Sequence, residues 1–319
     1  MGEATTRAAT AAGESDAPVH PGAPAAAIVA LANQKGGVGK TTTAVNAAVG
    51  LAHRGYRVLL VDIDPQGNAT SSLGVDKAAL LHSIYDVLVD EVPIARAVAV
   101  TDRPNLDLVA STPILAGAEV ELVDALERER RLAQALAAVA DRYHVVLIDC
   151  PPSLGLLTVN ALTAARSVIV PIQCEFLALE GLGQLITTID LVKRHLNPPL
   201  DVTGVLMTMF DARTRLSAHV VEEVRAYFPH RIFRSIVPRS VRLAEAPSYG
   251  QAILEYDPAS RGAAAYETFV GELVDRLKLS PAVSPLPVSE EPLVPSPNGS
   301  PVEVITSSAT SHADLTPSH

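Results

Sequence analysis

The sequence predicts an α/β protein whose doubly wound, mainly parallel sheet is flanked by helices. Short apolar runs alternate with longer helical patterns, and the runs are mostly β-branched or Leu-rich, as in strands covered on both faces. A chain of 319 residues with 48% hydrophobic content can bury a large core. We expect one domain at residues 27–279, between disordered arms at 1–26 and 280–319 that are rich in Pro, Ser, Ala or Thr.

Seven short apolar runs are predicted to be strands. They cover residues 27–32, 57–62, 106–110, 144–149, 167–172, 202–209 and 231–236. We expect a helix at 41–54, ended by Gly55, and another at 181–195, ended by the prolines that follow it. A last helix near 260–278 closes the domain.

A glycine-rich turn between the first strand and the first helix has the residues of a phosphate-binding loop. It reads Lys35-Gly36-Gly37-Val38-Gly39-Lys40-Thr41-Thr42. The glycines allow a tight turn that exposes N–H groups to an anion, and the helix N-terminus adds the positive end of its dipole. Lys40 is expected to bridge the β- and γ-phosphates of ATP, Thr41 to bind Mg²⁺ and Thr42 to contact the α-phosphate. The sequence therefore predicts a Mg²⁺-dependent ATP hydrolase.

The loop departs from the common pattern at its first position, where Gln34 replaces glycine and a second lysine, Lys35, follows. A lysine at the start of the loop can reach a phosphate across a dimer interface. It would then act as a cation supplied in trans, like an arginine finger. We therefore expect Lys35 to be catalytic together with Lys40.

Carboxylates end two predicted strands at the edge where ligands bind in open α/β sheets. Asp62 ends the second run, Asp64 follows it two residues later, and Asp149 ends the fourth run. Asp64 is the candidate for orienting the attacking water. Asp62 is expected to contact Mg²⁺-bound water or the loop lysine, and Asp149 to provide the second Mg²⁺ motif of phosphate-loop ATPases.

The formal net charge of −10 is unevenly distributed. Four acids and no Lys or Arg lie beyond residue 280, whereas residues 211–242 contain seven arginines and three acids. This local excess predicts a basic patch that contacts the phosphate backbone of nucleic acid without sequence preference.

The two cysteines, Cys150 and Cys174, lie far apart, which favours neither a disulfide framework nor a zinc site and fits a reducing cytosol. No apolar stretch approaches the roughly 20 residues that span a bilayer. We expect a cytoplasmic protein without a membrane partner.

Three motifs in this order resemble the ParA/Soj-type chromosome-partitioning ATPases, which have a deviant phosphate loop. They are the loop itself, residues 62–70 and residues 149–155, within a similarity that runs from about 27 to 278. The resemblance implies a homodimer joined by ATP, in which Lys35 of each subunit reaches the other's phosphates. It also implies nonspecific binding to double-stranded DNA on the nucleoid, and stimulation by a ParB-type centromere-binding partner during segregation of a chromosome or plasmid.

The same resemblance assigns further site residues. Arg213 and Arg242 match the family's DNA-contacting arginines, and Pro238 and Arg239 lie where the family holds adenine. These four assignments follow from the resemblance alone.

Two other classes share the scaffold. A MinD-like membrane-cycling positioning ATPase would need a basic amphipathic helix at the C-terminus, whereas residues 281–319 are acidic and broken by prolines. A nitrogenase-reductase-like protein would need cluster-ligating cysteines, and an ATP-dependent ligase would need a substrate pocket.

Overall fold

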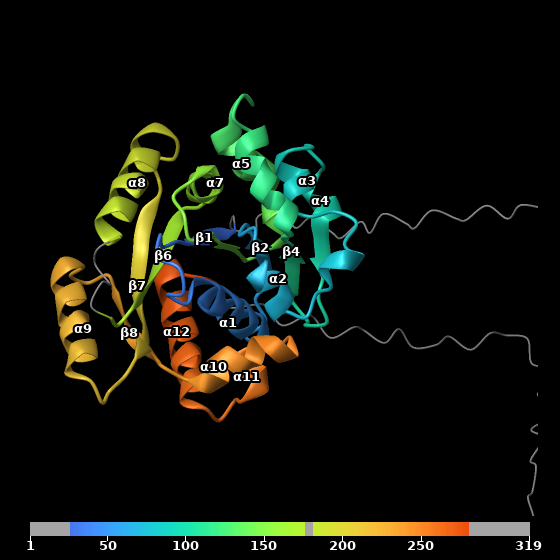
Figure 1. Cartoon of the computed structure of the whole chain (residues 1–319). Coiled ribbons are helices and arrows are strands. Elements are labelled where there is room, and N and C mark those ends of the chain that lie inside the picture. Colours follow the sequence, from blue (N-terminus) through green and yellow to red (C-terminus); the bar gives the residue numbers. More distant parts are fainter. Residues whose placement is uncertain (1–25, 176–180, 281–319) are drawn as a thin grey trace, which may run out of the picture. The chain divides into compact units, whose positions relative to one another are not determined.

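The structure is a computed structural model that describes residues 26–175 and 181–280 (Figure 1). The predicted disordered arms therefore lie, apart from Ala26 and Ser280, outside the described residues.

In this described part of the chain, eight strands form one sheet in the order β3-β4-β2-β5-β1-β6-β7-β8. They are β1 (Ala27–Leu31), β2 (Val58–Asp62), β3 (Val98–Val100), β4 (Leu106–Val109), β5 (Val145–Asp149), β6 (Ser167–Gln173), β7 (Asp201–Phe210) and β8 (Ile232–Pro238). All seven predicted strands are present and pair in parallel. The exception is the edge strand β3, which pairs antiparallel with β4 and is too short to show a periodic pattern in the sequence.

Helices cover both faces of the sheet (Figure 1). One face carries α1 (Lys40–His53), α2 (Asn68–Ser72), α10 (Val241–Glu245), α11 (Ile253–Tyr256) and α12 (Arg261–Leu277). The other carries α3 (Ile84–Leu88), α4 (Ile94–Ala97), α5 (Ala118–Glu121), α6 (Arg131–Ala137), α7 (Leu156–Ala164), α8 (Leu182–His195) and α9 (Arg215–Tyr227). Short 3₁₀ turns include η2 (Pro113–Gly117), η3 (Arg128–Arg130) and η5 (Ala246–Tyr249). The predicted α/β architecture is confirmed.

Alternation along the central strands builds two cores. Val29 and Leu31 of β1 face the cluster under α1 and α12, whereas Ala30 faces the cluster under the other helices. All five residues of β2 and of β5 are buried. This is the pattern of strands covered on both sides, and it fixes which strand ends are available for a site.

The predicted helix boundaries agree with the structure to within one or two residues. Gly55 follows α1 with a φ of 83°, which glycine adopts without strain. The Ser260 side chain accepts a hydrogen bond from the Ala263 N–H and caps α12. Within the described residues, none of the helices combines the length and the apolar character needed to cross a membrane.

Candidate nucleotide site and arginine surface

The carboxyl ends of β1, β2 and β5 meet at one edge of the sheet. β5 lies between β1 and β2, and its last residue, Asp149, pairs with Leu31 on one side and Asp62 on the other. The phosphate loop leaves β1 at this edge and leads into α1. The fold therefore brings together the glycine loop and the carboxylates that the sequence singles out.

The phosphate loop depends on two left-handed glycines and on the Asn33 side chain, which ties it to β6. Gly37 and Gly39 have φ values of 73° and 86°. Asn33 accepts a hydrogen bond from the Lys35 N–H at 3.0 Å and donates to the Pro171 carbonyl at 2.7 Å. Among the described residues no side chain caps α1, so its first-turn N–H groups remain available to an anion.

Lys40 is buried beneath this loop, with only 6% of its surface exposed. Its Nζ donates to the Lys35 carbonyl at 3.3 Å. Burial lowers the pKa of the ammonium, while the charge of Asp149 acts in the opposite direction. A buried ammonium with few partners is stabilised by an anion, which is the role expected of Lys40.

Asp149 is fully buried, and neither carboxylate oxygen accepts a hydrogen bond from any described residue. Burial and the nearby Asp62 raise its pKa well above the usual value, whereas the Thr41 hydroxyl and Lys40 lower it. Two free carboxylate oxygens beside a hydroxyl suit a hard cation such as Mg²⁺. Since no three Asp, Glu, His or Cys of the described chain form a metal cluster by themselves, further ligands would be water and phosphate oxygens.

Asp62 is equally buried but is held by the protein. One oxygen accepts hydrogen bonds from the Thr70 N–H and hydroxyl, both at 2.8 Å, and the other accepts from the Asp64 N–H at 3.2 Å. Burial raises its pKa, and these bonds oppose the rise. Asp62 therefore fixes the segment that carries Asp64, and any contact to Mg²⁺-bound water would come in addition.

Asp64 is positioned by a chain of hydrogen bonds from the next strand. The Ser111 hydroxyl donates to the Asp64 carbonyl at 2.7 Å, and the Ser111 N–H donates to the Thr70 hydroxyl at 3.0 Å. The Asp64 carboxylate accepts from the Gln66 N–H at 2.9 Å. Ser111 is not a sequence candidate, because nothing near it in the chain signals a site.

A cavity of about 210 Å³ adjoins the phosphate loop. Its lining includes the predicted residues Gly39, Thr42, Pro238 and Arg239. The rest of the wall is Thr208, Met209, Val237, Ser240, Leu243, Ala244 and Tyr266. An apolar slot beside a phosphate loop is suited to a flat heterocycle.

Arg213 and Arg242 follow the carboxyl ends of neighbouring strands, since Phe210 of β7 pairs with Pro238 of β8. Their side chains are 87% and 57% exposed. Arg213 pairs with Asp211 at 2.7 Å, and Arg242 pairs with Glu245 at 3.1 Å. Both arginines thus lie at the edge of the sheet that also carries the phosphate loop.

The basic patch is less positive than the local count predicts. Among the described residues, six of its seven arginines find an ion-pair partner, several of them an acid from outside residues 211–242. These outside acids are Glu175, Asp201, Glu245, Asp257 and Glu272. Apart from the pair with the buried Glu272, these pairs are largely exposed and therefore weak, so their arginines can exchange a carboxylate for a phosphate.

Comparison with known proteins agrees with the fold. Residues 26–202, more than half of the chain, match the family described as an AAA domain. The Bacillus subtilis sporulation initiation inhibitor protein Soj is 56% identical over 239 residues, which are 75% of this chain and 94% of that protein. The Myxococcus xanthus chromosome partitioning protein ParA is 53% identical over 249 residues, which are 78% and 88% of the two chains.

Solved structures give the same fold. Cobyrinic acid a,c-diamide synthase from Mycobacterium smegmatis, with bound ATP analogue and magnesium, matches with a TM-score of 0.70 and 41% identity over 79% of this chain and 96% of that chain. The Pyrococcus furiosus cell division ATPase MinD matches with a TM-score of 0.65 over 78% and 98%; at 24% identity it shows the fold alone. The three sequence motifs, their assembly at one sheet edge and the two relatives above 50% identity agree: the chain belongs to the ParA/Soj family of chromosome-partitioning ATPases.

Proposed function

We propose that this chain is a Mg²⁺-dependent ATPase that dimerises around ATP, binds double-stranded DNA without sequence preference, and segregates a chromosome or plasmid with a ParB-type partner. Its place would be the cytoplasm, on the nucleoid. The observation that carries the proposal is a buried lysine, Lys40, whose charge interacts with the buried Asp149. Neither carboxylate oxygen of Asp149 accepts a hydrogen bond from the described residues. Such a pair suits a magnesium–triphosphate complex, and the chain is 56% identical to Soj.

Each site residue has a role in this proposal. The N–H groups of residues 36–39 bind phosphate oxygens, Lys40 places its charge between the β- and γ-phosphates, and Thr42 contacts the α-phosphate. Thr41 and Asp149 would hold Mg²⁺, which when bound neutralises charge on the phosphates.

Hydrolysis would depend on Asp64 and Lys35. Asp64, fixed through Asp62, orients the attacking water, and Lys35 of each subunit contacts the phosphates bound by the other. Pro238 and Arg239 hold adenine in the neighbouring cavity. In this arrangement a dimer forms only around the triphosphate.

DNA binding is assigned to Arg213 and Arg242. We expect Arg213→Glu or Arg242→Glu to abolish binding of nonspecific duplex DNA in gel-shift assays, while ATP-dependent dimerisation survives. Arg194 is a matched control, because it is exposed at the end of α8 that leads to the start of β7, the opposite edge of the sheet. Unchanged DNA affinity in both test variants would contradict the assignment.

The function itself is tested by ATP hydrolysis measured with and without nonspecific DNA and a cognate ParB-type protein. The proposal expects strong joint stimulation. An ATP hydrolysis rate that neither addition changes would indicate that the chain works with a different partner.

The second candidate function is that of a synthase, because the M. smegmatis protein, which is 41% identical to this chain, is named cobyrinic acid a,c-diamide synthase. ATP turnover by a synthase should depend on its organic acid substrate and ignore DNA, so the same assay with cobyrinic acid separates the two functions. A MinD-like protein would instead sediment with liposomes in the presence of ATP.

A further inference from the structure

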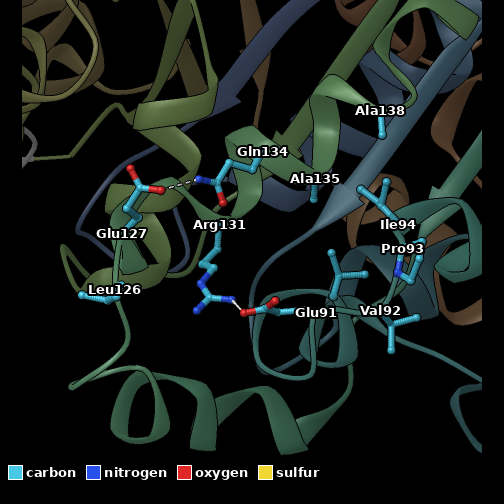
Figure 2. A pocket seen from close by; sticks show the side chains of 11 residues that line it. Glu91, Val92, Pro93, Ile94, Leu126, Glu127, Arg131, Gln134, Ala135 and Ala138 are labelled. Carbon is cyan, nitrogen blue, oxygen red and sulfur yellow. Dashed lines mark hydrogen bonds and ion pairs between the residues drawn. The ribbon is translucent and has the colours of Figure 1, made fainter.

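A second cavity, of about 390 Å³, shares no residue with the nucleotide site (Figure 2). It lies between α3–α4 on one side and residues 126–138, which include α6, on the other. Its lining combines apolar side chains, such as Val87, Ile94 and Ala135, with polar ones, such as Glu91 and Arg131. Leu126 also lines it, with 87% of its surface exposed. We call this cavity the α3–α6 groove.

Exposed apolar side chains continue from the groove onto the preceding turns. Val120, Val123 and Leu126 are spaced by three residues, and Val120 is 75% exposed. The Val123 N–H donates to the Val120 carbonyl, so Val120 and Val123 lie one turn apart at the end of α5, and Leu126 follows in the turn that leads to α6. Exposed apolar side chains beside a groove of mixed polarity are typical of a surface that binds an amphipathic protein segment.

The surroundings of the groove are acidic. Residues 84–94 and 118–138 contain eight Asp or Glu and three Arg. Two of these arginines pair within the set, Arg131 with Glu91 (Figure 2) and Arg128 with Glu129. Asp90, Glu119 and Asp124 are exposed and enter no ion pair with the described residues.

We propose that the α3–α6 groove and the exposed apolar side chains beside it dock a cationic amphipathic segment of a partner protein, which on the proposed function is the ParB-type partner. The apolar face of such a segment would cover these apolar side chains, and its Lys or Arg side chains would meet the acidic rim. The chain's own arms lack the positive charge that such a segment needs. Residues 1–25 carry one Arg against three acids, and residues 281–319 carry four acids with neither Lys nor Arg.

The groove is connected to the nucleotide site through α7. Asn160 of α7 donates to the Arg128 carbonyl at 2.8 Å and accepts from the Leu132 N–H at 3.1 Å, which ties it to the groove wall. The Glu119 side chain of α5 lies against Gly155, the residue before α7. Since α7 follows the loop after Asp149, Asn160 links the groove wall to the segment that leads away from Asp149.

The test uses the full chain, a non-hydrolysable ATP analogue, nonspecific DNA and the cognate ParB-type protein. We expect Asp124→Lys combined with Glu127→Lys, and separately Leu126→Ser, to weaken binding of this protein at least about tenfold and to remove its stimulation of ATP hydrolysis. ATP hydrolysis without the partner and DNA affinity should not change. Asp190→Lys and Leu191→Ser on α8 are matched exposed controls that should bind the partner normally.

A photoreactive benzoylphenylalanine in place of Leu126 identifies the occupant. Crosslinking to a Lys- or Arg-rich segment of the partner is expected. Crosslinking to a second copy of the chain or to its own arm would overturn the proposal, as would normal partner binding by the charge-reversed variant. A wild-type chain that fails to bind the ParB-type protein would overturn the proposed function as well.

Discussion

Two aspartates at the ends of neighbouring strands differ in the hydrogen bonds that their carboxylates accept. Asp62 and Asp149 are paired across β2 and β5, and burial raises the pKa of both. Thr70 and the Asp64 N–H satisfy Asp62, whereas no described residue satisfies Asp149. The free carboxylate is the one available to a metal ion.

Removing the Asp149 charge should stabilise the nucleotide-free protein. Since its pKa in the folded state lies above the usual 3.8, folding takes up a proton and the carboxylate destabilises the fold increasingly as pH rises above about 4. Asp149→Asn should therefore raise the free energy of unfolding by about 1–3 kcal/mol at pH 8 and by less at pH 5. Urea unfolding at both pH values measures this.

The same variant should lose the stabilisation that Mg²⁺ and ATP give to the wild type in thermal unfolding. A less stable apo protein, or an undiminished shift with Mg²⁺ and ATP, would show that Asp149 is a structural residue instead.

Water orientation by Asp64 should be separable from nucleotide binding. Asp64→Ala is expected to slow ATP hydrolysis by about 10²-fold or more with little change in ATP affinity, and to hold dimers on DNA. Ser111→Ala, which removes the hydrogen bond to the Asp64 carbonyl, should slow hydrolysis by about tenfold in the same way. Loss of ATP affinity in Asp64→Ala would assign that residue to structure or to the metal site.

Many individual residues of the site can be predicted from the sequence, because they cluster in three short motifs at strand ends. Lys40, Asp62, Asp64 and Asp149 do meet at one edge. Ser111 cannot be predicted, since its contact with Asp64 joins positions 47 residues apart.

Among the elements, α2, η5 and α11 are held together by Arg103. Its guanidinium donates to the Leu73 carbonyl at 3.0 Å and the Gly250 carbonyl at 2.6 Å, and it pairs with Glu255 at 2.7 Å. The backbone of Gly250 packs directly on Gly74. The segment that follows Asp64 is thereby attached to the elements next to Arg242.

A side chain at Gly250 should disrupt this contact. Gly250 has a φ of 64°, and a Cβ there would lie 2.9 Å from the Gly74 Cα. We expect Gly250→Ala to lower the free energy of unfolding by about 1–3 kcal/mol in urea titration. Gly183→Ala on α8, where a Cβ meets nothing within 4 Å, is the control and should be neutral or slightly stabilising. Equal stability of the two variants would contradict the close packing.

At the scale of the whole described domain, the sequence predicts the strand and helix layout because periodicity and strand composition are local. It does not predict β3, because three residues are too few to show a periodic pattern. It also does not predict that ion pairs reduce the positive charge of the basic patch. The acids that pair with those arginines come from distant segments, and only the fold brings them close.

The α3–α6 groove likewise depends on tertiary packing, since its two walls are separated in sequence by more than 30 residues. No motif marks it.

The central claim is that the γ-phosphate joins two copies of this chain through Lys35. Sedimentation equilibrium of the full chain with Mg²⁺ tests it directly. With a non-hydrolysable ATP analogue we expect twice the single-chain mass of 33.5 kDa, and with ADP the single-chain mass. Lys35→Ala should remain at the single-chain mass with either nucleotide. The same single-chain mass for the wild type with both nucleotides would contradict the account.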